Sequence, residues 1–171
     1  MYFTIRHSYW VTISLAILNA FFLVRILIIQ HDCGHQSFFK SKTANKIVGF
    51  ICSFFTIIPF KFWAKNHNFH HTHNGMLEVK EIGDVPLYTV EEYKQLSPWK
   101  KFCYRIYRHP FVLFVIGPLY YYLIQIRVPI LNSDLVKGKP DILLTNFYLV
   151  LFYGMLIYLL GWKQVLIVQG V

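Results

Sequence analysis

The sequence predicts an all-α protein of multi-pass integral membrane helices, with a cytoplasmic histidine-rich cap and a short re-entrant or interfacial helix. Three observations lead to this class. Hydrophobic residues make up 56% and aromatic residues 19% of the chain, well above the usual composition of soluble domains. Several apolar runs approach or reach the length of a membrane-crossing helix. Histidines gather in two clusters that flank one of these runs.

The first apolar run, residues 9–30, is long enough for a helix that crosses a hydrocarbon core of about 30 Å. Only Asn19 and Arg25 interrupt it. Arg25 lies near its end, so the guanidinium can reach the interface while the aliphatic stem stays in lipid. The run is too long for the core of a signal peptide, and we interpret it as a transmembrane helix.

The histidine clusters are His31-Asp32-Cys33-Gly34-His35 and His67-Asn68-Phe69-His70-His71. Residues spaced by three or four share a face of a helix, so each cluster directs its histidines to one point. Neutral imidazole suits iron, zinc, copper and nickel, and its ordinary pKa makes it available at neutral pH. The predicted metal ligands are His31, His35, His67, His70 and His71.

Three neighbours of these ligands have other expected roles. Asp32 can accept a hydrogen bond from a ligating ring and so fix its tautomer, although a solvated carboxylate is the alternative. His73 is out of phase with the ligand face and is expected not to bind metal. The Cys33 thiolate would favour zinc or iron–sulfur chemistry, so we do not assign it as a ligand either.

The apolar run between the clusters, residues 47–60, is shorter than the roughly 20 residues of a membrane span. As a re-entrant or interfacial helix it would return the chain to the side it left, with both clusters on one face of the membrane. A true span would instead separate the clusters by about 30 Å and exclude a shared metal centre.

The chain after the second cluster is polar and then amphipathic. Thr89 and Glu92 have the spacing of a capping box that opens a short helix ending before Pro98. The next segment has an apolar face of Trp99, Phe102, Cys103 and Ile106, and a basic face of Lys101, Arg105 and Arg108. This pattern predicts an interfacial helix, whose basic face could bind anionic lipid or dock an acidic electron-transfer protein.

Two further apolar segments, residues 111–131 and 142–162, predict a transmembrane hairpin closed by the polar turn 132–141. Residues 31–110 contain 11 of the 17 lysines and arginines, against three in residues 127–139, which favours a cytoplasmic position for the histidine region. Because spanning runs separate the charges, the net charge of +9 indicates anionic lipid headgroups as partners and argues against nucleic acid.

The motifs resemble those of the membrane-bound fatty acid desaturases, in particular the bacterial acyl-lipid type. The clusters are similar to their H-x-x-x-H and H-x-x-H-H histidine boxes, and further similar motifs are Gly83-Asp84, Thr89-Val90-Glu91-Glu92-Tyr93, Tyr104-Arg105-Ile106-Tyr107-Arg108-His109-Pro110, Gly117-Pro118-Leu119-Tyr120 and Val168-Gln169-Gly170. The resemblance implies one partial desaturase domain over residues 1–171, without the family's first transmembrane helix and third histidine box.

The resemblance also implies an activity and its partners. It points to oxygen-dependent desaturation of the acyl chain of a membrane lipid, at two non-haem iron ions held by the five histidines and the third box. Dioxygen would be the co-substrate, a ferredoxin- or flavodoxin-type protein the electron donor, and the cell membrane the location, with the histidine boxes facing the cytoplasm. The 171 residues alone are expected to bind iron weakly and to be inactive.

Other functions remain open from the residues. The same histidine pattern serves fatty-acyl and alkane hydroxylases, which differ in inserting oxygen into the substrate. A non-catalytic membrane protein that binds metal or lipid is a second alternative. A haem protein with two histidine ligands is disfavoured, because clustered histidines crowd one side of a helix pair instead of facing each other across a macrocycle.

Overall fold

The computed structural model describes residues 4, 7–76, 87–131 and 139–169. These residues form helices, turns and loops and no strand, and two helices are long and apolar enough to cross a membrane on their own. The prediction of an all-helical membrane protein is therefore confirmed. The Gly83-Asp84 pair and most of the expected turn 132–141 lie outside the described residues.

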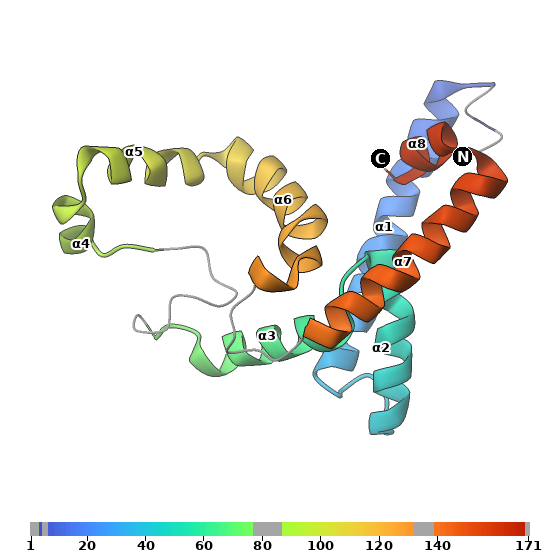
Figure 1. Cartoon of the computed structure of the whole chain (residues 1–171), viewed down its shortest axis with the longest axis horizontal. Coiled ribbons are helices and arrows are strands. Elements are labelled where there is room, and N and C mark those ends of the chain that lie inside the picture. The colour runs from blue at the N-terminus through green and yellow to red at the C-terminus, as the bar shows by residue number, and fades with distance from the viewer. Residues whose placement is uncertain (1–3, 5–6, 77–86, 132–138, 170–171) are drawn as a thin grey trace.

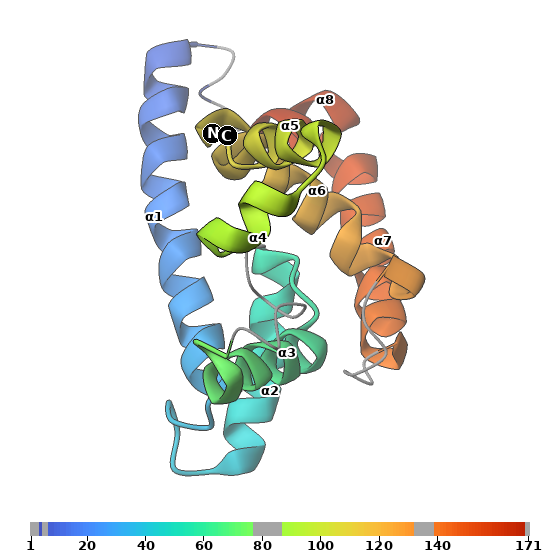
Figure 2. The ribbon, with the colours of Figure 1, turned by 90° about the vertical axis from the view of Figure 1, so that its left-hand side faces the viewer.

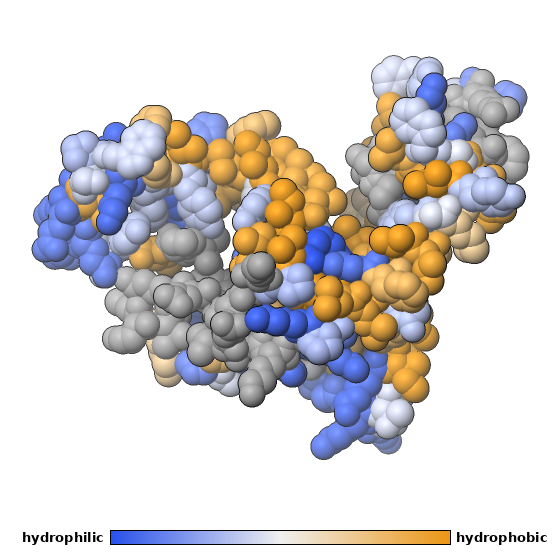
Figure 3. Space-filling model, in the orientation of Figure 1, coloured by the Kyte–Doolittle hydropathy of each residue, from blue (hydrophilic) through white to orange (hydrophobic). Residues whose placement is uncertain are grey.

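The two long helices are α1 (Tyr9–Gly34) and α7 (Lys139–Leu160), which run in opposite directions (Figure 1). Ser8 caps the start of α1 by accepting a hydrogen bond from the backbone N–H of Val11. Hydrophobic side chains cover much of α6 and α7 in the space-filling view, whereas hydrophilic ones gather around α4 and at the lower end of α2 (Figure 3). An apolar outer surface is what lipid-facing helices require.

The run between the histidine clusters forms a sharply bent helix pair. Helix α2 (Lys42–Thr56) packs along α1, and α3 (Phe60–His73) follows at an angle of 103°. Ile57 ends α2 in the left-handed conformation with φ 55°, and Pro59 precedes α3. Figure 2 shows α3 crossing the lower end of α1. The bend suits either a broken span or a re-entrant loop, and the latter stays our prediction.

The expected capping box is confirmed. At the start of α4 (Val90–Gln95), the Thr89 hydroxyl accepts a hydrogen bond from the backbone N–H of Glu92. In return, the Glu92 carboxylate accepts one from the backbone N–H of Thr89. Helix α5 (Pro98–Tyr107) follows, and both helices project to one side of the α1, α2 and α7 group (Figure 1). The large side chains on the apolar face of α5 are exposed.

The segment expected as one helix over residues 111–131 is broken. A π-helical turn, η2 (Val112–Ile116), leads into α6 (Gly117–Leu123), and short 3₁₀ turns follow at η3 (Gln125–Arg127) and η4 (Pro129–Leu131). Pro118 has no N–H to continue the regular ladder, and Gly117 bonds instead to the carbonyl of Val112, five residues back. A second break, at Gly161 with φ 86°, separates α7 from α8 (Trp162–Gln169).

A small core joins the start of α3 to the start of α7. Its buried members are Ile58, Phe62, Ile126 and Ile142, with Leu27 of α1 packed against them. The core therefore links the bend, η3 and α7 at the end of the molecule where α1 finishes.

Candidate metal centre

The last turn of α1 carries the first histidine pair. His31 lies within the helix, and His35 is its C-terminal cap, one turn later. The two ring centroids are 4.6 Å apart. The spacing of four residues therefore places both imidazoles on one side of the helix end, as the sequence predicted.

The second pair lies on α3. His67 and His71 are also four residues apart, and their Nε2 atoms are separated by 3.1 Å. Their ring centroids are 4.5 Å apart with nearly perpendicular planes. Two nitrogen atoms at this separation can share one metal ion, since metal–nitrogen bonds are about 2.0–2.1 Å long.

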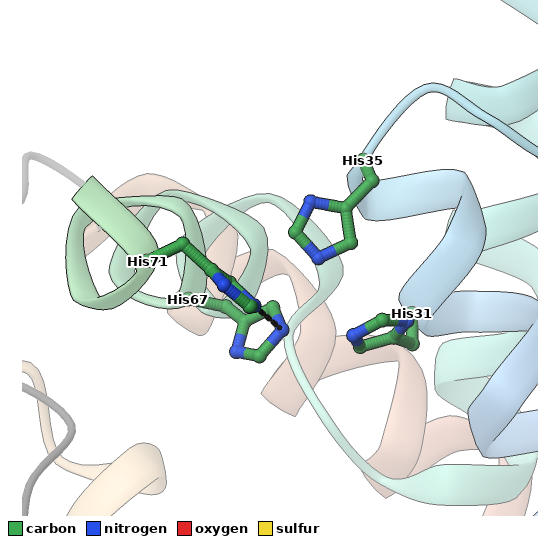
Figure 4. Close-up of side chains that lie close together, drawn as sticks. All are labelled: His31, His35, His67 and His71. Carbon is green, nitrogen blue, oxygen red and sulfur yellow. Dashed lines mark hydrogen bonds between the residues drawn. The ribbon is translucent and has the colours of Figure 1, made fainter. Parts of the chain in front are cut away.

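The bend between α2 and α3 brings the two pairs together (Figure 4). One ring nitrogen from each of His31, His35, His67 and His71 lies within 4.8 Å of the others. The His31 and His67 rings are 4.8 Å apart across the helix interface, and the His35 and His71 rings 4.9 Å. The four nitrogens are thus close enough together to hold a metal ion.

Close packing of α1 against α3 sets this distance. Trp63, on the first turn of α3, stacks on His67 with ring centroids 4.6 Å apart and an angle of 15°. Gly34 faces the same indole, and a Cβ atom there would lie 3.1 Å from Trp63 Cζ3. The Asn68 side chain donates to the carbonyl of Gly34 at 3.4 Å. A side chain at position 34 would therefore press on the indole of Trp63, which would have to shift by a few tenths of an ångström.

Sequence reasoning missed part of this arrangement. Neither Trp63 nor Asn68 was predicted from the sequence to take part in the site. Each acts across the α1–α3 contact, and no spacing in the sequence reveals which residues face each other there.

Asp32 lies beside a candidate ligand ring, as one of the two roles considered for it requires. The Nδ1 atom of His31 is 2.9 Å from Asp32 Oδ1, so the ring can donate a hydrogen bond to the carboxylate. A proton held on Nδ1 leaves the lone pair on Nε2 for a metal. Asp32 therefore can set the tautomer of one candidate ligand.

The electrostatics favour neutral rings. His35 and His67 lie outside the two long apolar helices, α1 and α7. Burial is the main cause that lowers the pKa of both rings, and the nearby His31 lowers it further. The pKa of His67 falls to about 4. Imidazole binds metal in its neutral form, so these two rings are ready to bind at neutral pH.

The fifth predicted ligand lies beside the group of four. The His70 ring is 6.4 Å from that of His67 and 5.9 Å from that of His71. The structure thus brings four of the five histidines together and places the fifth on a neighbouring face of α3. His73 points elsewhere, stacking on Phe69 at 3.9 Å.

The fold and the site define a class: a helical membrane protein with four histidines gathered at the junction of two helices. The chain belongs to the fatty acid desaturase family, whose model matches residues 8–171.

Individual relatives agree with this assignment. A protein of Bacillus subtilis named fatty acid desaturase is 39% identical over 171 residues, covering 99% of this chain and 48% of the relative. In Synechocystis, an sn-1 oleoyl-lipid 12-desaturase is 33% identical over 60% of this chain and 27% of its own length. A ferredoxin-type sn-1 acyl-lipid omega-3 desaturase from that organism is 29% identical over 80% of this chain and 39% of its own length.

The chain therefore spans half or less of the length of these relatives. No solved structure matches it.

Proposed function

We propose that the protein to which this chain belongs desaturates fatty acyl chains of membrane lipids, at a non-haem di-iron centre that includes these histidines. The observation that carries the proposal is the convergence of His31, His35, His67 and His71 from two helices. Family membership supports the acyl substrate, and the names of two relatives refer to lipid-bound acyl chains.

The donor set fits iron. All four candidate ligands are imidazoles, which suit iron, and two of them have lowered pKa values that keep them neutral. Bound iron would supply the activation of dioxygen that removal of two hydrogens from unactivated methylene groups requires, together with two external electrons.

The chain's own residues would hold and orient the metal. His31, His35, His67 and His71 would bind the first ion, and Asp32 would keep the Nδ1 proton of His31 in place. His70, on the neighbouring face of α3, would contribute to the second ion. The remaining ligands would come from the third histidine box that the resemblance implies, so these 171 residues alone would lack activity.

The remaining partners follow from the relatives and the charge pattern. One relative is named as using ferredoxin, which supports a ferredoxin- or flavodoxin-type donor here. The concentration of lysine and arginine in residues 31–110 supports a cytoplasmic position for the histidines in the cell membrane.

The test is the fatty acid profile of cells that express the complete parental reading frame, measured by gas chromatography with mass spectrometry. New unsaturated chains should appear, and should vanish in His67→Ala but persist in His73→Ala, the matched control on the same helix. Hydroxylated products would identify the hydroxylase alternative instead. An unchanged profile from well-expressed, iron-loaded protein would contradict the proposal and favour a non-catalytic role.

A further inference from the structure

Gln30, directly before His31, has a completely buried side chain at the end of α1. Its Nε2 atom lies 3.1 Å from Ser53 Oγ, 3.3 Å from the carbonyl of Ile58 and 3.4 Å from the carbonyl of Gly49. All three partners belong to α2 or to the turn that follows it. The side chain thus joins the helix of the first histidine pair to the segment that leads to the second.

The turn held by Gln30 is strained. Ile57 has φ 55° and ψ 19°, a left-handed conformation that a β-branched residue rarely adopts. Gln30 bonds to both neighbours of this residue: its Oε1 accepts from Thr56 Oγ1 at 2.7 Å, and its Nε2 donates to the carbonyl of Ile58. Such backbone conformations persist only where surrounding contacts determine them.

The direction of α3 depends on this turn. The chain bends by 103° between α2 and α3, and the bend carries His67 and His71 to the end of α1. We infer that Gln30 is a positioning residue for the metal centre: it holds the Ile57 turn and so sets the separation of the two histidine pairs. This inference rests on the proposed metal-binding function.

A general role in helix association makes a different prediction. A buried amide between two membrane helices adds to their affinity for each other wherever it lies. Removing it would then lower stability without a specific effect on metal binding. Thr12, buried near the opposite end of the same helix, provides a control for the loss of a buried hydrogen-bonding side chain far from the histidines, since its hydroxyl donates to the carbonyl of Ser8 at 3.0 Å.

The experiment is a Co²⁺ titration of the full chain in detergent micelles, followed by the visible absorption of the bound ion. Gln30→Met keeps a side chain of similar length and removes the amide. We expect this variant to bind Co²⁺ about tenfold more weakly, the size of loss typical when a group that orients metal ligands is removed. The absorption spectrum of the bound ion should also change. Thr12→Val should bind Co²⁺ like the wild type. Far-UV circular dichroism checks that each variant keeps its helices.

A second-site variant tests the route through the turn. Glycine adopts the left-handed conformation freely, so Ile57→Gly removes the strain that Gln30 counters. The double variant Gln30→Met/Ile57→Gly should therefore recover much of the lost Co²⁺ affinity. If Gln30→Met loses helical content, Thr56→Val replaces it, because this change removes the hydroxyl that donates to Gln30 Oε1, together with its contacts with the Cys52 carbonyl and the Ile58 N–H next to the turn.

The inference is overturned if Gln30→Met binds Co²⁺ with wild-type affinity and spectrum, or if the double variant shows no recovery. Failure of the proposed function looks different: the wild type would then bind no Co²⁺, or His31→Ala would bind it as well as the wild type.

Discussion

The carboxylate of Asp141, on α7, accepts a hydrogen bond from the backbone N–H of Phe62, on the first turn of α3, at 3.0 Å. Pro59, at the N-cap of α3, offers no side-chain acceptor. Asp141 therefore provides the cap from 79 residues further along the chain, and its negative charge lies at the positive end of the helix dipole. The helix that carries His67 and His71 is thus fastened at its start by α7.

Replacing this cap should loosen α3. We expect Asp141→Ala to lower the free energy of unfolding by about 0.5–2 kcal/mol, as for the loss of other N-caps. Asp141→Asn, which keeps an acceptor oxygen, should lose less. Unfolding by sodium dodecyl sulfate in mixed micelles, followed by circular dichroism, measures both. Equal losses for the two variants would contradict the capping role.

Two glycines within helices should respond oppositely to alanine. A Cβ atom at Gly49 would lie 2.3 Å from ring carbons of Phe60, so Gly49→Ala should destabilise by about 1–3 kcal/mol through overpacking. Gly154 on α7 has no atom within 4 Å of such a Cβ, so Gly154→Ala should stabilise by about 0.5–1 kcal/mol. The same unfolding assay compares them, and a stable Gly49→Ala would contradict this packing of α2 against Phe60.

Arg127 and Asn146 form a reciprocal pair between η3 and α7. The guanidinium Nη1 donates to Asn146 Oδ1 at 3.1 Å, and Asn146 Nδ2 donates to the Arg127 carbonyl at 2.7 Å. Asn146→Leu removes both bonds, one to the half-buried guanidinium and one to the Arg127 backbone carbonyl, and should lower stability by about 1–3 kcal/mol. Tyr158→Leu, at an 89% exposed position of the same helix, should have little effect. An equally small loss of stability in both variants would show that the Arg127–Asn146 pair does not stabilise the fold.

Asp32 should influence metal binding from outside the ligand set. Its carboxylate accepts from His31 Nδ1, so Asp32→Ala should weaken Co²⁺ binding about tenfold, within the range for lost outer-shell partners. Glu91→Ala removes the same charge at an exposed position on α4 and should leave the titration unchanged. A similar loss in both variants would indicate a general charge effect instead.

Substitutions of His70 and His71, the neighbouring histidines of α3, should affect metal binding to different extents. His71→Ala removes one of the four convergent rings and should weaken binding of the first Co²⁺ ion more than tenfold, whereas His70→Ala should affect it far less. Titration of the full chain separates the two. A larger loss in His70→Ala would show that the ligand set differs from the four rings gathered here.

Local features were predictable because they depend on neighbours in the sequence. The spacing of His31 from His35, and of His67 from His71, fixes which rings share a helical face. The capping box of Thr89 and Glu92 is likewise a contact across three residues, and it forms as expected. The break near Pro118 was not foreseen, although proline's missing N–H gives a local reason for it.

The sequence by itself determined that this protein is helical, that it has apolar spans and that its histidines come in pairs on helix faces, because periodicity and composition act over a few residues. Only the tertiary structure decided that the pairs meet. That outcome depends on contacts between distant residues: Gln30 with Ile58, Gly34 with Trp63, and Asp141 with Phe62. Such contacts form only once the chain has bent at Ile57 and packed, and no local pattern encodes which distant groups will face each other.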